Sequence, residues 1–296
     1  MLINQASLDG VFTSLNAIFN AAFTGVVPTH EQIAMVVPSN TRTNDYKFML
    51  QFPMLQEWVG DRTLKSLASE HFTITNKDYE ASIEVDRNDI EDDQIGIYNP
   101  IVGELGRAAA QHPSKLLAAL MAAGFTTKCF DGEYFFDTDH PVAGVGNVSN
   151  YGGGAGTAWY LLDATRAIRP FIFQRRTMPQ LTRQDRPDDE NYFMRKKFRY
   201  GVDYRGAVGY GLWQLAYASK DTLNESNLQT AITAMKDFKN DEGVKLGITP
   251  NLLIVPNSLE FTARGILDRD LLGVTGEGTK SNIMKGILQL MVNPWL

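Results

Sequence analysis

The sequence has little cysteine and no long apolar run, and both absences narrow what the protein can be. Cys129 is the single cysteine among 296 residues, which excludes an intrachain disulfide and a cysteine-rich zinc site. We therefore expect synthesis in a reducing compartment. The most apolar stretch, Leu116 to Phe125, is far too short to span a bilayer, and the N-terminus lacks the basic start and apolar run of a signal peptide. These features predict a soluble protein that is not exported and has no membrane partner.

Positive charge is also scarce. The chain has 28 Lys and Arg against 34 Asp and Glu, a net charge of −6, whereas a free nucleic-acid-binding domain is usually basic. The charge is uneven, because residues 77–93 contain eight acids and two bases while residues 166–205 contain eleven bases and five acids. Such a split usually marks two solvated faces. In a self-assembling protein it can instead place one copy's acidic strip against the next copy's basic segment.

Motifs for catalysis and metal binding are largely missing. The four histidines share no zinc spacing, no Gly-x-Ser-x-Gly elbow occurs, and the glycine-rich residues 143–157 lack the closing pair of a phosphate loop, which indicates a flexible connection. One cluster could ligate a metal or do acid–base chemistry: Asp137, Asp139 and His140. The same run also suits a tight turn ending at Pro141, which is the interpretation we favour. We therefore predict no catalytic residue, no metal site and no cofactor.

Residues 99–124 carry the strongest helical pattern. Asn99 and Pro100 suit a helix start, and Gly124 suits a left-handed helix end. One apolar face recurs at helical spacing and consists of Ile101, Leu105, Ala108, Leu116, Leu120 and Met121. A helix of this length should form a rod of about 36 Å. Because Pro113 lacks a backbone N–H donor, we expect the rod to bend near residues 111–114.

The flanking segments predict further helices and strands. Residues 7–24 form an amphipathic helix capped by Ser7, interpreted first as a core helix and alternatively as an arm that needs a neighbouring subunit. A second helix at 224–239, capped by Asn224, precedes a buried strand at 252–255 and a helix that starts near Pro256. Further strands are expected at residues 79–86, 171–173, 192–194, 198–200, 211–217 and 287–292.

Residues 41–71 read as a long loop or hairpin with large apolar side chains. Excursions of this length in compact proteins are usually functional, and exposed aromatic side chains most often serve a protein contact.

Several stretches, by their order and spacing, resemble the major head protein family of phage Mu and Mu-like prophages. These stretches are Glu57-Trp-Val-Gly-Asp-Arg62, Phe72-Thr-Ile-Thr-Asn-Lys77, Val85-Asp-Arg-Asn-Asp-Ile-Glu-Asp-Asp93, Asp131-Gly-Glu-Tyr-Phe-Phe-Asp-Thr-Asp-His-Pro141, Tyr210-Gly-Leu-Trp-Gln-Leu-Ala216 and Leu253-Ile-Val-Pro256. They cover nearly the whole chain. The local departures are the basic run from Phe193 to Phe198 and the loop from Asp185 to Asn191.

The resemblance implies an α+β fold, the Hong Kong 97-like capsid fold of tailed phages and herpesviruses. Its parts would be an N-terminal arm (1–40), an extended hairpin loop (41–75) and the strand, spine helix and turn of a peripheral domain (76–141). The glycine-rich connection and strand-rich part of the peripheral domain (142–222), an axial domain (223–274) and a C-terminal loop with a closing strand (275–296) would follow.

The resemblance also implies the function of a major capsid protein in the virion. Copies would assemble in the bacterial cytoplasm as hexamers and pentamers of an icosahedral shell, with scaffold and portal proteins as partners and double-stranded DNA enclosed without sequence specificity. We expect intersubunit contacts at Phe52, Met54, Leu55, Trp58, Arg87, Asp92 and Asp93. The alternatives are a cellular compartment shell of the same fold and a metal-dependent hydrolase that uses Asp137, Asp139 and His140.

Overall fold

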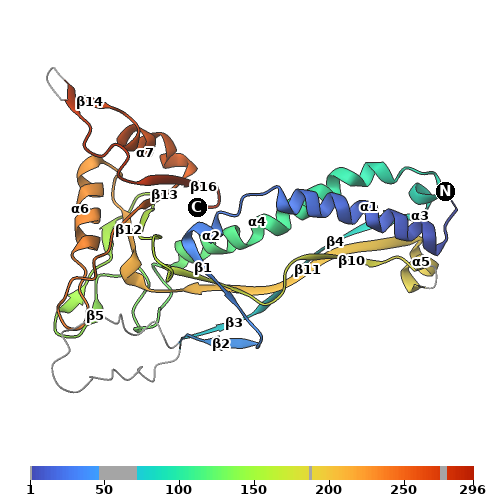
Figure 1. Cartoon of the computed structure of the whole chain (residues 1–296), viewed down its shortest axis with the longest axis horizontal. Helices are drawn as coiled ribbons and strands as arrows, with labels where there is room; N and C mark the ends of the chain where they lie inside the picture. The colour runs from blue at the N-terminus through green and yellow to red at the C-terminus, as the bar shows by residue number, and fades with distance from the viewer. Residues whose placement is uncertain (1, 47–71, 187–188, 274–278) are drawn as a thin grey trace.

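The longest strand, β11 (Lys197–Tyr210), organises the elongated part of the protein (Figure 1). The structure is a computed structural model, and it describes residues 2–46, 72–186, 189–273 and 279–296. β11 pairs antiparallel with β4 (Lys77–Asp86) over ten residue pairs. Its other edge pairs with β10 (Gln180–Gln184) and then β9 (Phe171–Arg175), and β1 (Ala34–Pro38) joins β9 in parallel.

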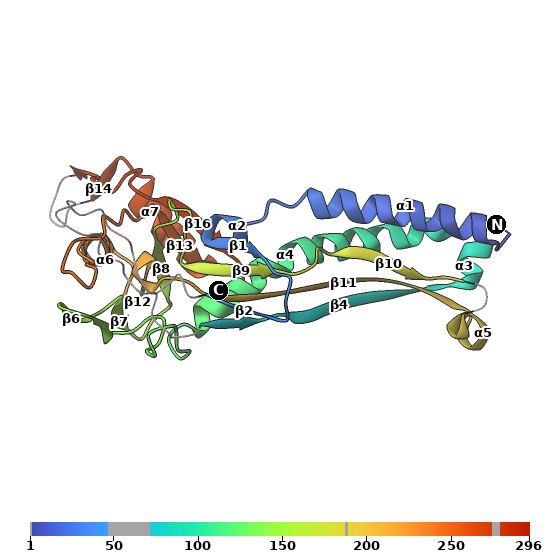
Figure 2. The same cartoon turned by 60° about the horizontal axis from the view of Figure 1, so that its bottom comes forward.

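Two helices cover one face of this sheet (Figure 2): α1 (Gln5–Thr24) lies along α4 (Asn99–Ala123). The buried residues of α1 are Leu8, Val11, Leu15 and Phe19, and they share a core cluster with Val102 and Leu105 of α4 and Val85 of β4. The helices approach closely because α4 has Gly106 there; a Cβ at this position would lie 2.5 Å from the Phe19 carbonyl oxygen. Of the two interpretations of residues 7–24, the helix packed on its own chain is the one observed.

α1 begins at Gln5, two residues before the predicted start, and its N-cap lies three residues before the predicted cap Ser7. Asn4 is the N-cap, its side chain accepts from the Ser7 backbone N–H at 2.9 Å, and the Ser7 hydroxyl closes the reciprocal bond with the Asn4 N–H at 3.0 Å. Ser7 therefore belongs to the capping box as its third helical residue rather than as the cap itself.

Both predicted ends of α4 need correction. Asn99 is already helical because the 3-10 turn η2 (Ile95–Tyr98) leads into the helix, so it does not cap it. Gly124 has φ −61°, not a left-handed conformation. It is small for a different reason, since a Cβ at this position would lie 2.7 Å from the Phe136 ring.

The buried face of α4 is rotated relative to the prediction. Leu105 and Met121 are buried as expected, but Ile101 and Ala108 are exposed, and small residues such as Ala109 and Ala118 face the core instead. Pro113 is buried inside a helix that is continuous from residue 99 to residue 123. The bend at residues 111–114 stays a prediction.

A second sheet forms the wider part of the molecule, with the strand order β16-β13-β8-β12-β7 (Figure 1). Its strands are β7 (Tyr151–Gly154), β8 (Trp159–Leu162), β12 (Ala216–Lys220), β13 (Leu252–Pro256) and β16 (Gln289–Asn293). The helices α6 (Glu225–Lys236) and α7 (Glu260–Leu267) lie in the same part. Its core holds large, fully buried aromatic side chains, among them Trp159, Tyr160 and Trp213.

Short elements complete the described chain. They are α2 (His30–Ile33), β2 (Thr43–Asp45), β3 (Thr73–Thr75), α3 (Arg87–Glu91), β5 (His140–Val142), β6 (Gly146–Val148), α5 (Glu190–Arg195), η3 (Trp213–Leu215), η4 (Asn257–Leu259), β14 (Leu271–Gly273) and β15 (Thr279–Ser281). Among the described residues, no helix has the length and apolar character needed to cross a membrane.

Three local predictions are wrong. Residues 192–194 form part of helix α5 rather than a strand, and residues 211–217 begin with the 3-10 turn η3 before β12 starts at Ala216. The glycine-rich residues 143–157 include the strands β6 and β7 rather than only a connection. Asn224 caps α6 as predicted, and its side chain accepts from the Asn227 N–H at 2.8 Å.

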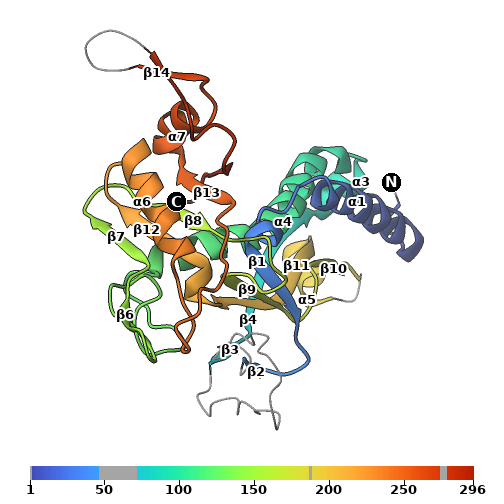
Figure 3. The same ribbon diagram turned by 60° about the vertical axis from the view of Figure 1, so that its left-hand side comes forward.

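We call α1, α3, α4, α5, β4, β10 and β11 the shaft, and β5 to β8, β12, β13, β16, α6 and α7 the body. Figures 1 and 2 show the shaft extending away from the body, with α3 and α5 at its far end. The strands β2 and β3 project from the shaft sheet on the side opposite α1 (Figure 3).

Candidate assembly surfaces

The base of the predicted extended loop is fixed to the sheet by buried polar contacts. β2 and β3 pair antiparallel, and the buried Asn76 donates from Nδ2 to the Ser39 hydroxyl and the Thr41 carbonyl, both at 2.9 Å. Tyr46 donates to Gln174 Oε1 at 2.7 Å, and burial raises the pKa of Tyr46 to about 12, which keeps this donor protonated. Both chain segments that lead into residues 47–71 are therefore anchored. The loop contacts predicted from the sequence lie outside the described residues: Phe52, Met54, Leu55 and Trp58.

The acidic strand β4 finds basic partners within its own chain. Glu84 pairs with Lys197 Nζ at 3.0 Å and Arg199 Nε at 3.1 Å, and Asp78 pairs with Arg205 Nε at 2.5 Å. The two ion pairs of Glu84 lower its pKa. Part of the basic segment predicted to meet a neighbour's acids is thus engaged by the antiparallel register of β4 and β11.

The acidic turn after α3 differs from the strand. Arg87 pairs with Glu91 at 2.6 Å, and its guanidinium lies 5.2 Å from the centre of the Tyr192 ring. Asp92 and Asp93 are exposed, and neither forms an ion pair with another described residue. Of the charged contact candidates, Arg87 is held within the chain and these two carboxylates face solvent.

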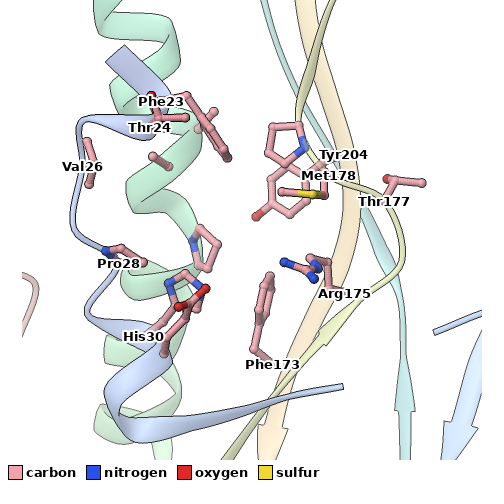
Figure 4. A pocket seen from close by; sticks show the side chains of 15 residues that line it. Phe23, Thr24, Val26, Pro28, His30, Phe173, Arg175, Thr177, Met178 and Tyr204 are labelled. Atoms are coloured by element: carbon pink, nitrogen blue, oxygen red, sulfur yellow. The ribbon is translucent and has the colours of Figure 1, made fainter. Parts of the chain in front are cut away.

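A cavity of about 260 Å³ lies beside Pro113, between the α1–α2 connection, α4 and the sheet (Figure 4). Phe23, Phe173 and Met178 are among its apolar lining residues. The connection is tied to the helix one residue further on, where the Ser114 hydroxyl accepts from the Thr29 hydroxyl at 2.9 Å and the His30 N–H at 3.2 Å. Pro113 therefore lines the cavity, and the next residue, Ser114, is hydrogen-bonded to the α1–α2 connection.

His30 lines the same cavity as a neutral group. Its ring packs edge-on against Phe173, with the ring centres 5.1 Å apart. Burial lowers the pKa of His30, and Arg175 lowers it further while Glu31 acts in the opposite direction.

The alternative interpretation, a site made of Asp137, Asp139 and His140, is not what the structure brings together. The Asp137 carboxylate accepts from the backbone N–H groups of Thr138 at 2.7 Å and Tyr134 at 3.2 Å, which is the turn interpretation. Asp139 is exposed. His140 is fully buried and meets a different carboxylate, because its Nδ1 lies 2.7 Å from Asp131 Oδ2.

This buried group is saturated by internal contacts. His140 stacks on Trp213 with ring centres 4.0 Å apart, its Nε2 lies 3.2 Å from Asn150 Oδ1, and the Cys129 thiol donates to Asp131 Oδ1 at 3.0 Å. Cys129, Asp131 and His140 are the described residues with ligand atoms close enough to hold a metal ion. Burial, followed by the Asp131 charge, raises the pKa of Cys129, so the thiol stays protonated and donates to Asp131.

The comparisons with known proteins give a consistent result over the whole chain. A model of the Mu-like prophage major head subunit gpT family matches residues 8–296. The major capsid protein of Escherichia phage Mu is 40% identical over 306 residues and covers 100% of both chains. The major head subunit of the Mu-like prophage FluMu of Haemophilus influenzae is 39% identical over 300 residues, covering 98% of this chain and 97% of that one. The chain belongs to the Mu-like major head subunit family.

The fold agrees with this family. A chain from the procapsid of bacteriophage JBD30 is 40% identical and superimposes with a TM-score of 0.86 over 99% of this chain and 100% of that one. The predicted fold class, the α+β capsid fold of tailed phages, is confirmed.

Two features of the described residues were not predicted from the sequence. Asp131 as the partner of His140 was missed because the two residues are nine positions apart and meet only through the turn between them. The exposed helix α5 was missed because its alternating apolar and aromatic residues were interpreted as a strand.

Proposed function

We propose that this protein is the structural subunit of a Mu-like phage capsid, which self-assembles as hexamers and pentamers into an icosahedral shell that encloses double-stranded DNA. The observation that carries this proposal is the similarity to a procapsid chain along the full length of both chains. Its mechanism is the formation of interfaces rather than chemistry.

The domain division implied by the family resemblance is part of the proposal. Residues 1–40 are the arm, packed here along α4, and residues 41–75 are the extended loop. Residues 76–141, with α4 as the spine, and residues 142–222 are the peripheral domain, which includes strands of both the shaft and the body. Residues 223–274 are the axial domain, and residues 275–296 return the chain to β16 beside β13.

We assign the main intersubunit anchors to the extended loop. Phe52, Met54, Leu55 and Trp58 are apolar side chains of the types that dominate protein interfaces. The buried hydrogen bonds at Tyr46 and Asn76 support this, because a fixed base lowers the entropy that a loop loses on binding. Arg87, Asp92 and Asp93 are assigned as charged contacts at the far end of the shaft.

We also assign a bend to α4 at Pro113. The residue lacks the backbone donor of the i to i−4 hydrogen bond, and the adjoining cavity leaves space into which the neighbouring side chains can move. A change in the curvature of the spine would then accompany changes in the shell.

The partners follow from the same role. Scaffold and portal proteins would meet the shell during assembly in the host cytoplasm, and the mature shell would hold DNA without reading its sequence. The net charge of −6 is consistent with DNA that must move freely past the inner wall.

The test is assembly of the expressed chain. Sedimentation and negative-stain microscopy should show shells or capsomers, and a compact monomer at all concentrations would contradict the proposal. Trp58→Ala should lower the assembled fraction while leaving the melting temperature of the unassembled subunit unchanged. Lys65→Ala, in the same segment, is the matched control and should assemble like the natural chain.

A further inference from the structure

The helix α5 lies at the far end of the shaft (Figure 2), and two of its apolar side chains are exposed. Phe193 is 84% exposed and Met194 is 69% exposed, although both are large apolar side chains. Their neighbour Tyr192 points the other way, stacking on Phe198 with ring centres 5.1 Å apart. Tyr192 thus holds the helix on the sheet, while Phe193 and Met194 face solvent. Exposed apolar side chains that are grouped in one patch mark a contact surface.

Unpaired cations lie at the C-terminal end of this apolar surface, whereas the exposed Glu190 lies in the first turn of α5. Arg195 ends the helix, and Lys196 follows it in a left-handed conformation with φ 54°. Both side chains are exposed, and neither forms an ion pair with a described residue. The next cation, Lys197, is by contrast paired with Glu84.

Unpaired acids lie at the same end of the shaft. The exposed Asp92 and Asp93 follow α3, and α3 is joined to the end of α5 by a hydrogen bond from the Arg87 N–H to the Lys196 carbonyl at 2.9 Å. The two charged groups therefore belong to elements that are joined at this end of the shaft, and they form no ion pair with each other among the described residues. The cations Arg195 and Lys196 lack an acidic partner, and the acids Asp92 and Asp93 lack a basic one, among the described residues.

We propose that α5 of one copy docks on the Asp92–Asp93 turn of a second copy, with Phe193 and Met194 buried in this tip contact. Opposite charges on one rigid end make the surface self-complementary, and opposed potentials guide association and fix its register. A nucleic acid would bind the cations but would be repelled by the adjacent acids, which favours another copy of the chain. The proposal rests on the self-assembly proposed above and names a surface through which it occurs.

A charge swap tests the tip contact. The base variant is Arg195→Glu with Lys196→Asp, the acid variant is Asp92→Lys with Asp93→Lys, and the swap combines all four changes at unchanged net charge. Positions 93 and 196 both have a left-handed backbone, with φ 59° and 54°. Aspartate tolerates this conformation at position 196, and the natural Lys196 shows that lysine can adopt it at position 93. The readout is the fraction of protein that sediments as shells, with the natural chain as reference.

Each charge variant should lower the shell fraction about tenfold, and the swap should restore it to within about twofold of the natural chain, since restored opposite charges recover the coupling. The double variant Phe193→Ser with Met194→Ser should also lower the shell fraction, and adding the four charge changes of the swap should not restore it. Variants that assemble like the natural chain, or a swap that assembles no better than its two halves, would overturn the tip contact while leaving the proposed function intact. A natural chain that never forms shells would instead contradict the proposed function.

A cross-link gives a second measurement that does not depend on how the charge variants fold. Met194→Cys protein and Asp92→Cys protein are mixed before assembly and oxidised, so any new disulfide between these positions must join two chains. Dimers should form only in the mixture. Dimers in the Met194→Cys sample alone would place α5 against α5, and either this result or the absence of dimers in mixed shells would refute the contact. If all charge variants form shells normally but lose DNA binding, the cations form a DNA-binding surface, and the tip contact is refuted.

Discussion

The body and the shaft are stabilised in different ways. In the body, every residue of β8 and β13 is buried, and large aromatic side chains fill the space around them. In the shaft, β4 is exposed at most positions, and the core is a thin layer between α1, α4 and one face of the sheet. The comparison shows that the body is stabilised mainly by a dense aromatic core, whereas the shaft has a thin core and a sheet strand that is exposed at most positions.

The largest effect is expected where the body is densest. Trp213→Ala would remove the ring that stacks on His140 at 4.0 Å and contacts Phe238 at 5.6 Å. Loss of a fully buried tryptophan should lower the free energy of unfolding by about 3–5 kcal/mol. Urea denaturation of unassembled subunits measures it, with Trp295→Ala, at a partly exposed site, as the control. Equal losses at the two positions would show that the body has no special dependence on its aromatic core.

The second prediction concerns the thin core of the shaft. Gly106→Ala would push a methyl group to 2.5 Å from the Phe19 carbonyl and force α1 away from α4, at a cost of about 2 kcal/mol. Gly103→Ala, one turn earlier in the same helix, would meet only the Ile18 methyl at 3.9 Å and should stabilise the helix by about 0.5–1 kcal/mol. Thermal unfolding of both variants measures the change in stability. If both substitutions stabilise or both destabilise the protein, the close approach of α1 and α4 at Gly106 is contradicted.

Sequence reasoning was most accurate where the signal is local. The periodicity of α1, α4 and α6 gave their positions to within three residues at each end, because amphipathic spacing acts within a few turns, whereas of the three predicted N-caps only Asn224 is confirmed. It was wrong where a distant contact decides. Gly124 ends α4 as predicted, but in a right-handed conformation, and Phe136 packs against it so closely that no side chain would fit. Residues 192–194 looked like a strand, but they fold as a helix whose Tyr192 reaches Phe198 and Arg87.

The candidate surfaces show the same division. The acidic and basic segments were visible in the composition, but the register that joins Glu84 to Lys197 and Arg199 links residues more than a hundred positions apart. No local pattern specifies that register. The pairing of His140 with Asp131 rather than Asp137 likewise depends on the fold of the intervening turn.

The third prediction tests whether the buried polar group stabilises the body through charge. Burial acts to raise the pKa of Asp131, but hydrogen bonds from His140 and Cys129 outweigh it, and the net pKa is lowered. A carboxyl with a lowered pKa in the folded state stabilises the protein fully above its unfolded pKa of about 3.9 and loses this contribution as the pH falls through the folded value.

Asp131→Asn should therefore cost about 1 kcal/mol at neutral pH, and the difference from the natural chain should shrink as the pH falls below about 4. Denaturation at a series of pH values from neutral to acid measures it. Asp139→Asn, at an exposed neighbouring position, is the control and should show no such difference. A gap for Asp131→Asn that stays constant across the acid range would show that the contact does not depend on the charge.

The smallest effect is expected on the open face of the shaft. Glu84 pairs with Lys197 and Arg199, but all three side chains are at least one-third exposed, so water and salt screen their interaction. Glu84→Gln should leave the melting temperature of the subunit unchanged within error, whereas Glu84→Lys, which places three cations together, should lower it measurably at low salt and less at high salt. A large loss for Glu84→Gln would mean that the shaft relies on cross-strand charge as the body relies on its aromatic core, and the contrast between the two regions would no longer hold.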